Sequence, residues 1–357
     1  MRNKDYLTVL LTSVGGQVSP LIIKCLKSEE NPSVRVVGVD AKQDAIGSYF
    51  CDAFKVVPYG TDKDYVPAVL EFAQQEKVDV IIPGSDEEVL ALSKVKESFS
   101  QKGVTVACSE PSTVEIASDK LKMLSFLKDK GIRTPGFSAP VNISEFKDAL
   151  YELGYPDHPV VFKPRRSRGG RGFWLITRDA DDERLLLGSP YNRNISFKTM
   201  VDILSNTARF PEIILMEYLP GADFNVDVLT KSGESLYIIP NERLQPDAGP
   251  VEVGLIREDL PAKEMAEKVA SAFGFDYLIN IEMAYPRDEE TGPLVYEINP
   301  RVSAPIAAYA AAGVNLLYMA VLLAANYDLP QNLEARETRM IRYWSDYYAH
   351  SQRRFVP

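Results

Sequence analysis

Apolar runs alternate with amphipathic stretches along the N-terminal third of the chain. The runs are "LTVLLTSV" (7–14), "VRVVGVD" (34–40), "FKVVPY" (54–59), "VDVIIPG" (78–84) and "VTVAC" (104–108), and helical patterns lie near 20–28 and begin at Tyr65 and Glu87. Strands that are almost wholly apolar and alternate with helices indicate a parallel sheet covered on both faces. The pattern therefore predicts an α/β domain with a doubly wound parallel sheet over residues 1–112.

The turn after the first run, "TSVGGQVSP", allows two interpretations. Together with Asp40 at the end of the second run, it resembles a dinucleotide-binding fingerprint, but the third glycine of G-x-G-x-x-G is missing. Alternatively, Gly15 and Gly16 only let the chain turn tightly above the sheet. The second interpretation is favoured, and the first stays open.

In the segment "SEPSTVEIASDKLKMLSFLKDKGIRTPGF" (109–137), Pro111 marks a boundary and is followed by a run with helical periodicity. Its apolar positions predict one amphipathic helix that ends at Gly131: Ile116, Leu121, Met123, Leu124 and Leu127. Asp119 and Lys120 lie near the beginning of this helix. By itself Lys120 is a solvated helix charge.

Positive charge and glycine are concentrated in "VVFKPRRSRGGRGF" (160–173). Alternation places Lys163 on the face of Val161, and Pro164 is expected to break the strand ladder. The glycines that follow are too permissive for regular structure, so the loop can bring backbone N–H groups and arginines to phosphate oxygens. An arginine–glycine segment that binds nucleic acid is the alternative, but only one copy is present, between two strand-like runs.

The stretch "PEIILMEYLPGADFNVDVL" (211–229) predicts two strands joined by a Pro-Gly turn. Taken alone it is a hairpin in which Asp223 is a turn residue. In the other interpretation, Glu217 to Leu219 form an extended linker whose backbone groups recognise an adenine edge, and Asp223 accepts hydrogen bonds from ribose hydroxyls.

Two further runs, "LINIEM" (278–283) and "LVYEINPRVS" (294–303), predict neighbouring antiparallel strands. Period-two alternation places Asn280 with Glu282 on one face, and Val295, Glu297 and Asn299 on one face of the neighbour. Facing glutamates repel unless a cation lies between them, and such oxygen ligands suit Mg²⁺. Arg301 could then meet negative charge on a transferred group. The alternative is a pair of solvent-facing glutamates on a hairpin.

The order of these motifs resembles that of the ATP-grasp ligases, most closely the branch related to the large chain of carbamoyl phosphate synthase. The resemblance covers nearly the whole chain. It implies that the N-terminal domain is followed by an ATP-grasp domain of α+β type over 113–330. The glycine-loop subdomain would cover about 113–218, the metal and catalytic subdomain about 219–330, and a C-terminal tail 331–357.

The resemblance also implies roles for individual residues. Lys120 and Lys163 would contact phosphates, and "SRGGRG" would be the mobile loop that closes over the nucleotide. The nucleotide-binding residues implied are Lys120, Lys163, Ser167, Gly169, Gly170, Gly172, Glu217, Tyr218, Leu219 and Asp223, the last where glutamate is more usual. The metal ligands implied are Glu282, Glu297 and Asn299, and the catalytic residues Arg301, Lys163 and Arg171.

The activity implied is an ADP-forming ligation. ATP, with Mg²⁺ (two ions, or Mn²⁺ as a substitute), would phosphorylate a small-molecule carboxylate, and an amine or thiol would attack the acylphosphate. Two alternatives stay open: a subunit that phosphorylates bicarbonate or carbamate, and a nucleotide-binding protein without turnover. "NERLQPDAGPVEVG" (241–254) lacks the histidine expected of the bicarbonate site, which disfavours bicarbonate, and its Arg243 could hold a carboxylate.

Composition limits the partners and the cellular compartment that the sequence suggests. The formal net charge of −10 and pI of about 5.0 argue against general affinity for nucleic acid. No apolar run is long enough to cross a membrane, and three widely spaced cysteines suit reduced thiols in the cytoplasm. Residues 299–330 are apolar and helical, which favours core packing. The aromatic stretch "RMIRYWSDYYAH" (339–350) could line an acceptor pocket or form the interface of a homodimer.

Overall fold

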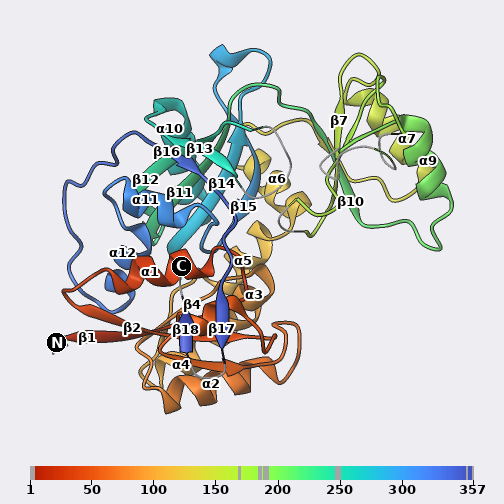
Figure 1. Cartoon of the computed structure of the whole chain (residues 1–357). Coiled ribbons are helices and arrows are strands. Elements are labelled where there is room, and N and C mark those ends of the chain that lie inside the picture. The colour runs from red at the N-terminus through yellow and green to blue at the C-terminus, as the bar shows by residue number, and fades with distance from the viewer. Residues whose placement is uncertain are drawn as a thin grey trace.

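The computed structural model describes residues 5–167, 170–183, 187, 193–245, 251–350 and 353–355. Within these ranges the strands form three large sheets and one two-stranded ribbon (Figure 1). The ribbon consists of β17 (Tyr348–His350) and β18 (Arg353–Phe355) near the C-terminus. The large sheets follow one another along the chain, with one late strand added to the third.

The first sheet has the strand order β3-β2-β1-β4-β5, and every described pair in it is parallel. Its elements are β1 (Tyr6–Leu11), α1 (Ser19–Lys27), β2 (Ser33–Asp40), η1 (Ile46–Tyr49), β3 (Ala53–Val56), α2 (Tyr65–Gln75), β4 (Val80–Ile82), α3 (Asp86–Ser93), α4 (Lys96–Ser100) and β5 (Thr105–Val106). Side chains of β1 alternate between two cores, since Val9 packs with α1 and Leu10 packs with α2. The predicted doubly wound parallel sheet is confirmed.

The turn after β1 is closed by Asp40. One carboxylate oxygen accepts the Gly15 N–H at 2.7 Å and the other accepts the Lys42 N–H at 2.9 Å. A Cβ on Gly15 would lie 2.7 Å from Asp40 Oδ2, so only glycine permits this approach. This is the arrangement that the tight-turn interpretation predicts.

The second sheet has the order β6-β10-β7-β8-β9 and lies to the right in Figure 1. Its elements are β6 (Phe137–Ser138), α7 (Ile143–Glu152), β7 (Val160–Pro164), β8 (Trp174–Ile176), β9 (Asn194–Ile195), α9 (Phe197–Ser205) and β10 (Ile213–Glu217), and α7 and α9 share one core with the strands. Pro164 was expected to break the ladder, but it is the last residue of β7. Pairing continues beyond it, because the Arg165 N–H donates to the Glu212 carbonyl at 3.0 Å.

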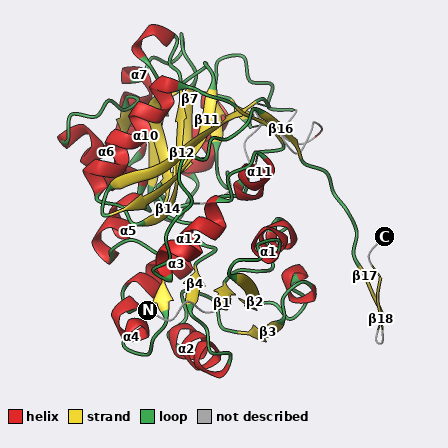
Figure 2. Ribbon diagram, turned by 90° about the vertical axis from the view of Figure 1, so that its left-hand side faces the viewer, coloured by secondary structure: helices red, strands yellow, loops and turns green. Residues whose placement is uncertain are grey.

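The third sheet has the order β15-β14-β11-β12-β13-β16 (Figure 2). Its strands are β11 (Asp223–Lys231), β12 (Glu234–Arg243), β13 (Val253–Ile256), β14 (Tyr277–Ala284), β15 (Leu294–Asn299) and β16 (Thr338–Ile341), with η2 (Glu289–Thr291) before β15. One face packs against α5 (Pro111–Ala117), α6 (Lys120–Asp129) and α10 (Leu260–Phe273). The other face packs against α11 (Ile306–Ala311) and α12 (Leu316–Ala324), which confirms core packing for the late apolar segment.

One local prediction was wrong. The segment predicted as one helix is two, α5 and α6, because Asp119 caps α6 by accepting the Lys122 N–H at 3.2 Å and interrupts the helical run. Of the two interpretations of 211–229, the hairpin is excluded. β10 pairs with β7 in the second sheet and β11 pairs with β12 and β14 in the third, so residues 218–222 connect two sheets.

Candidate active site

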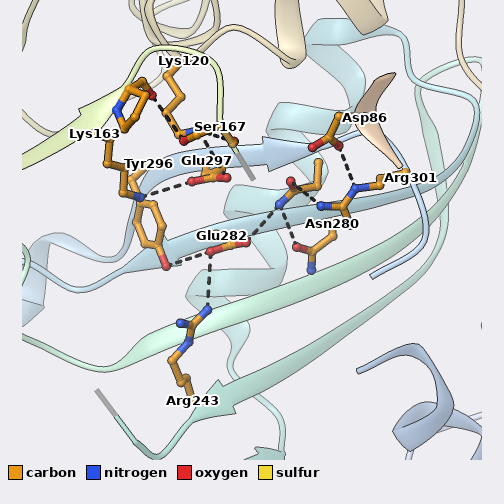
Figure 3. Close-up of polar contacts among 12 residues, drawn as sticks. Asp86, Lys120, Lys163, Ser167, Arg243, Asn280, Glu282, Tyr296, Glu297 and Arg301 are labelled. Atoms are coloured by element: carbon orange, nitrogen blue, oxygen red, sulfur yellow. Dashed lines mark hydrogen bonds and ion pairs between the residues drawn. The ribbon is translucent and has the colours of Figure 1, made fainter. Parts of the chain in front are cut away.

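A cavity of about 410 Å³ separates the second and third sheets. Most of the residues singled out by their motifs line it: Lys163, Ser167, Gly170, Arg171, Glu217, Tyr218, Leu219, Asp223, Glu282, Glu297, Asn299 and Arg301. Lys120 is buried beside it and contacts two of these residues (Figure 3). Gly172 is not among the lining residues, and Gly169 lies outside the described residues. The fold thus brings together side chains from both sheets.

The floor of the cavity is set by the register of β14 and β15. Glu282 lies opposite Glu297, and Asn280 lies opposite Asn299. A bulge beyond Glu282 leaves Tyr296 unpaired. Simple alternation placed Val295 with Glu297, and this was wrong because the extra residue turns Val295 into the opposite, buried core.

Two lysines contact Glu297, Lys120 from α6 and Lys163 from β7 (Figure 3). Lys120 Nζ lies 3.4 Å from Oε1 and Lys163 Nζ lies 3.2 Å from Oε2. Although burial opposes ionisation, these cations lower the pKa of Glu297 to about 2. Glu297 is therefore a carboxylate at neutral pH, and both lysines have their charged ends at the edge of the cavity.

Glu282 has a different environment. Arg243 Nη2 lies 3.5 Å from Glu282 Oε2, and the Tyr296 hydroxyl donates to the same oxygen at 3.3 Å and to Asp223 at 2.8 Å. Burial raises the pKa of Glu282, and the charge of Glu297 adds to that effect while Arg243 opposes it. Arg243 thus pairs with the protein's own carboxylates, Asp223 included.

A chain of amides continues from Glu282 into the core. Asn299 Nδ2 donates to Glu282 Oε1 at 3.0 Å and to Asn280 Oδ1 at 3.3 Å. Asn280 in turn donates to Asp227 at 3.1 Å, which also accepts from the Tyr309 hydroxyl at 2.6 Å. Burial raises the pKa of Asp227 to about 6. These bonds hold the Asn299 amide in one orientation beside the glutamates.

Arg301 lies at the end of the cavity that faces the first sheet. Its Nε donates to Asp86 Oδ1 at 2.7 Å, and its Nη2 donates to Asn299 Oδ1 at 3.2 Å. Asp86 is the first residue of α3, and sequence reasoning missed it, as it missed Tyr296. A signal for Asp86 existed: it follows the strand–turn "VIIPGS", and the carboxyl ends of parallel strands are where ligands bind in such sheets.

The basic loop between β7 and β8 lies over the cavity. The Ser167 carbonyl accepts from Lys120 Nζ at 3.0 Å, and Gly170 and Gly172 have φ of 69° and 71°. A Cβ on Gly172 would lie 2.5 Å from Pro164 Cγ. Glycine is therefore required here by both backbone conformation and space.

The linker that leaves β10 borders the same cavity. The Glu217 N–H donates to the Gly136 carbonyl at 2.8 Å, and Glu217 Oε2 accepts the Gly136 N–H at 3.1 Å. Because its side chain and its N–H both contact Gly136, Glu217 would contact a ligand through its backbone carbonyl. Tyr218 and Leu219 complete this part of the lining.

Glu282, Glu297 and Asn299 fit a divalent cation. Their carboxylate and amide oxygens are the hard donors that Mg²⁺ prefers, and the opposed glutamates would be relieved of repulsion by a cation. In the part of the chain that the structure describes, no three His, Cys, Asp or Glu side chains gather as a metal-binding group. A cation at this site would therefore have two carboxylates and one amide as protein ligands. That set suits Mg²⁺, which usually keeps several waters and binds phosphate oxygens as well.

The fold and the cavity define the class. A parallel-sheet domain, followed by two sheets that hold a cavity lined by lysines, a glycine loop and paired glutamates, is the ATP-grasp architecture. Residues 209–346 match the family described as "ATP-grasp in the biosynthetic pathway with Ter operon", and residues 9–107 match the family "PylC-like, N-terminal domain". The part of the chain over residues 209–346 therefore belongs with the ATP-grasp proteins.

Curated relatives include carbamoyl phosphate synthases. That of Methanobrevibacter smithii is 22% identical over 301 residues, which cover 80% of this chain and 73% of the relative. The large chain from Pseudothermotoga lettingae is 27% identical over 358 residues, which cover 93% of this chain but 30% of the relative. The chain therefore spans less than a third of that large chain.

Solved structures show the same fold. N5-carboxyaminoimidazole synthetase from Staphylococcus aureus, complexed with ADP, has a TM-score of 0.67 at 17% identity and covers 94% of this chain and 82% of its own. L-amino acid ligase from Bacillus licheniformis has a TM-score of 0.62 at 15% identity, with coverages of 91% and 75%. In the described part of the chain, no helix is both long and apolar enough for a membrane crossing.

Proposed function

We propose that this protein is an ATP-dependent ligase that joins a small-molecule carboxylate to an amine through an acylphosphate and releases ADP and phosphate. One observation carries the proposal. Lys120 and Lys163 from the glycine-loop side meet Glu297 from the metal side in one cavity that Arg301 also lines. This arrangement supports triphosphate binding, metal binding and stabilisation of a developing negative charge within one site.

Different residues would bind the different parts of ATP. Lys120 and Lys163 would exchange Glu297 for phosphate oxygens, and the loop from Ser167 to Gly172 would cover them with backbone N–H groups. Glu217 to Leu219 would hold the adenine edge, and Asp223 would accept from the ribose. Mg²⁺ held by Glu282, Glu297 and Asn299 would screen the charge of the β- and γ-phosphates.

The reaction then follows in two displacements. A carboxylate oxygen attacks the γ-phosphorus, the bond from that phosphorus to the ADP oxygen breaks, and an acylphosphate forms. The amine nitrogen attacks the acyl carbon, the bond from that carbon to the phosphate oxygen breaks, and the nitrogen loses a proton. Arg301 would stabilise the oxyanion, and Lys163 and Arg171 would contact the transferred group. Closure of the loop would exclude water from the acylphosphate.

Phosphorylation of bicarbonate is the less supported alternative. The segment around Arg243 carries no histidine, and Arg243 is paired with Asp223 and Glu282. The likeness to an L-amino acid ligase and to a carboxyaminoimidazole synthetase concerns the fold, which supports ATP-dependent C–N chemistry as a class. An organic carboxylate is therefore the acceptor we propose.

The proposal is tested by ADP release across pairs of carboxylates and amines. We expect ADP release to require both partners, whereas ADP release with bicarbonate alone would contradict the proposal. Glu297→Gln should lower turnover by at least about a hundredfold, since a metal ligand and a lysine partner are lost together. MgADP binding, measured by calorimetry, should persist more weakly.

The matched control is Glu258→Gln, which alters an exposed glutamate paired with Lys263. It should leave turnover unchanged. Wild-type turnover in Glu297→Gln would refute the assigned metal site.

A further inference from the structure

A second, smaller cavity adjoins the active site. It measures about 140 Å³ and lies between the ends of β1 and β4, the helix α1 and residues 301–304. Arg301, Ser303 and Ala304 line both this cavity and the larger one. A molecule in the smaller cavity would therefore meet the reacting centre at Arg301.

The lining of the smaller cavity is mainly aliphatic. Val14, Val18, Ile22, Ile82 and Val302 contribute apolar surface. The hydroxyls of Thr12 and Ser13, which also line it, both donate to Glu88 Oε2 at 2.6 Å, so neither directs its proton to a ligand. Ser19 and Ser303 add two further hydroxyls, so the space favours a mainly apolar body.

Arg301 is the one charged residue among the described residues that line the smaller cavity. Three of its five N–H donors are used, by Asp86, Asn299 and the Val302 carbonyl, so two stay available for a ligand. A carboxylate is the anion that a guanidinium binds with best geometry. A second charge on the molecule, whether ammonium or carboxylate, would find no opposite charge of its own among the described residues of this lining.

The size of the cavity limits the apolar body. An aliphatic cavity of about 150 Å³ accommodates benzene, which has six non-hydrogen atoms. The 140 Å³ found here therefore suits a body of about six carbons.

We propose that the smaller cavity holds the aliphatic body of the carboxylate substrate while Arg301 holds its carboxylate at the larger cavity. The substrate class is a small aliphatic monocarboxylate with no second charged group. This inference rests on the proposed ligase function and names the substrate of that same site. The amine would approach from the larger cavity after ADP-forming phosphorylation.

The test uses hydroxylamine as the nucleophile, so the natural amine need not be known. The hydroxylamine nitrogen attacks the acylphosphate, phosphate leaves, and a hydroxamate forms that is measured by its iron complex. Wild-type enzyme with MgATP is given unbranched carboxylates from acetate to decanoate. We expect kcat/KM to rise about fourfold per methylene to an optimum near six or seven carbons and then to fall.

Variants of Ile22 test whether the aliphatic body of the substrate lies in the smaller cavity. Ile22 lines the cavity from α1, whereas its neighbour Leu21 is 53% exposed and does not. Ile22→Phe should shift the optimum to acids shorter by roughly two carbons, and Ile22→Ala to longer acids. Leu21→Phe should leave the profile unchanged. Thermal melting of each variant confirms that it is folded.

Each outcome decides something. A profile that is flat, or that Ile22→Phe does not move, would overturn the inference. Hydroxamate formation only with amino acids or dicarboxylates would also overturn it, and the ligase proposal would stand. If no carboxylate of any class supports ADP and hydroxamate formation, the ligase proposal itself fails.

Discussion

At the scale of single residues, Arg301 depends on a carboxylate from another part of the chain. Asp86 is 215 residues away in sequence, yet it holds Arg301 Nε at 2.7 Å. Asp86 lines neither of the two cavities that Arg301 lines. It can therefore act on a substrate only through the arginine, as a positioning residue.

Asp86→Asn should lower kcat about tenfold, because the guanidinium loses its charged partner and its fixed orientation. KM for ATP and the affinity for MgADP should change little, because the lysines and the adenine linker are untouched. Asp86→Glu should restore part of kcat. Steady-state ADP release, with calorimetry for MgADP, measures the two effects separately.

The control for Asp86 is Asp52→Asn, which breaks a half-exposed ion pair with Lys27 of 2.6 Å. That pair lies away from both cavities, so kcat should be unchanged. The positioning role would be contradicted if Asp86→Asn matched wild type, or if it lost MgADP affinity and kcat together.

At the scale of elements, irregularities of the strands and loops position the side chains that line the larger cavity. The bulge in β15 lets Tyr296 and Glu297, which are adjacent in sequence, both line the cavity. The loop after β7 turns with two glycines at positive φ, and Gly172 lies against Pro164. A regular ladder could provide neither arrangement.

Gly172→Ala should destabilise the loop and reduce turnover. A side chain at φ of 71° is strained, and the new Cβ would lie 2.5 Å from Pro164 Cγ in a rigid ring. Gly131→Ala is the matched control, because Gly131 has φ of 72° and a Cβ there would meet nothing within 4 Å. Gly172→Ala should lose about 1–3 kcal/mol more free energy of unfolding than Gly131→Ala, and this difference measures the clash of the new Cβ with Pro164.

Urea unfolding and ADP release measure this pair of variants. Equal stabilities would show that Gly172 is needed only for its backbone conformation. Equal turnover would show that the loop does not control the reaction.

At the scale of the whole molecule, one hydrophobic core joins the first and third sheets. α12 packs Leu317 and its neighbours against residues of both, and the Tyr318 hydroxyl donates to the Pro32 carbonyl at 3.0 Å. One face of the second sheet has its own core with α7 and α9, and its other face joins the core that the third sheet shares with α6 and α10. Arg301 and Asp86 are therefore held where the first and third sheets share a core, which the face of the second sheet toward α7 and α9 does not enter.

Leu317→Ala should cost about 2–5 kcal/mol, because a buried side chain leaves a cavity. Hydrogen exchange followed by mass spectrometry should quicken in both the first and third sheets, since they share this core. Leu215→Ala, in the separate core, should quicken exchange in the second sheet alone. Quickening of the third sheet alone in Leu317→Ala would contradict a shared unit.

Much of the fold was predictable because periodicity is a local property. The strands of the first sheet, the pairing of the "LINIEM" and "LVYEINPRVS" runs, and the core position of the late helices all follow from apolar spacing. The motif order also led to the superfamily. The errors at Asp119 and Val295 arose where one residue interrupts a regular pattern, which periodicity cannot show. The error at Pro164 was the reverse, because pairing continues past a residue that was expected to end it.

The sequence by itself determined the alternating elements of the first sheet, the strands that carry the paired glutamates and the chemical groups that are present, because each depends on neighbours along the chain. Only the tertiary structure decided that Asp86 reaches Arg301 and that a small, mainly aliphatic cavity opens beside that arginine. These features depend on how separate units pack against each other. Packing is fixed by side chains that are close in space and distant in the chain, so no local pattern records it.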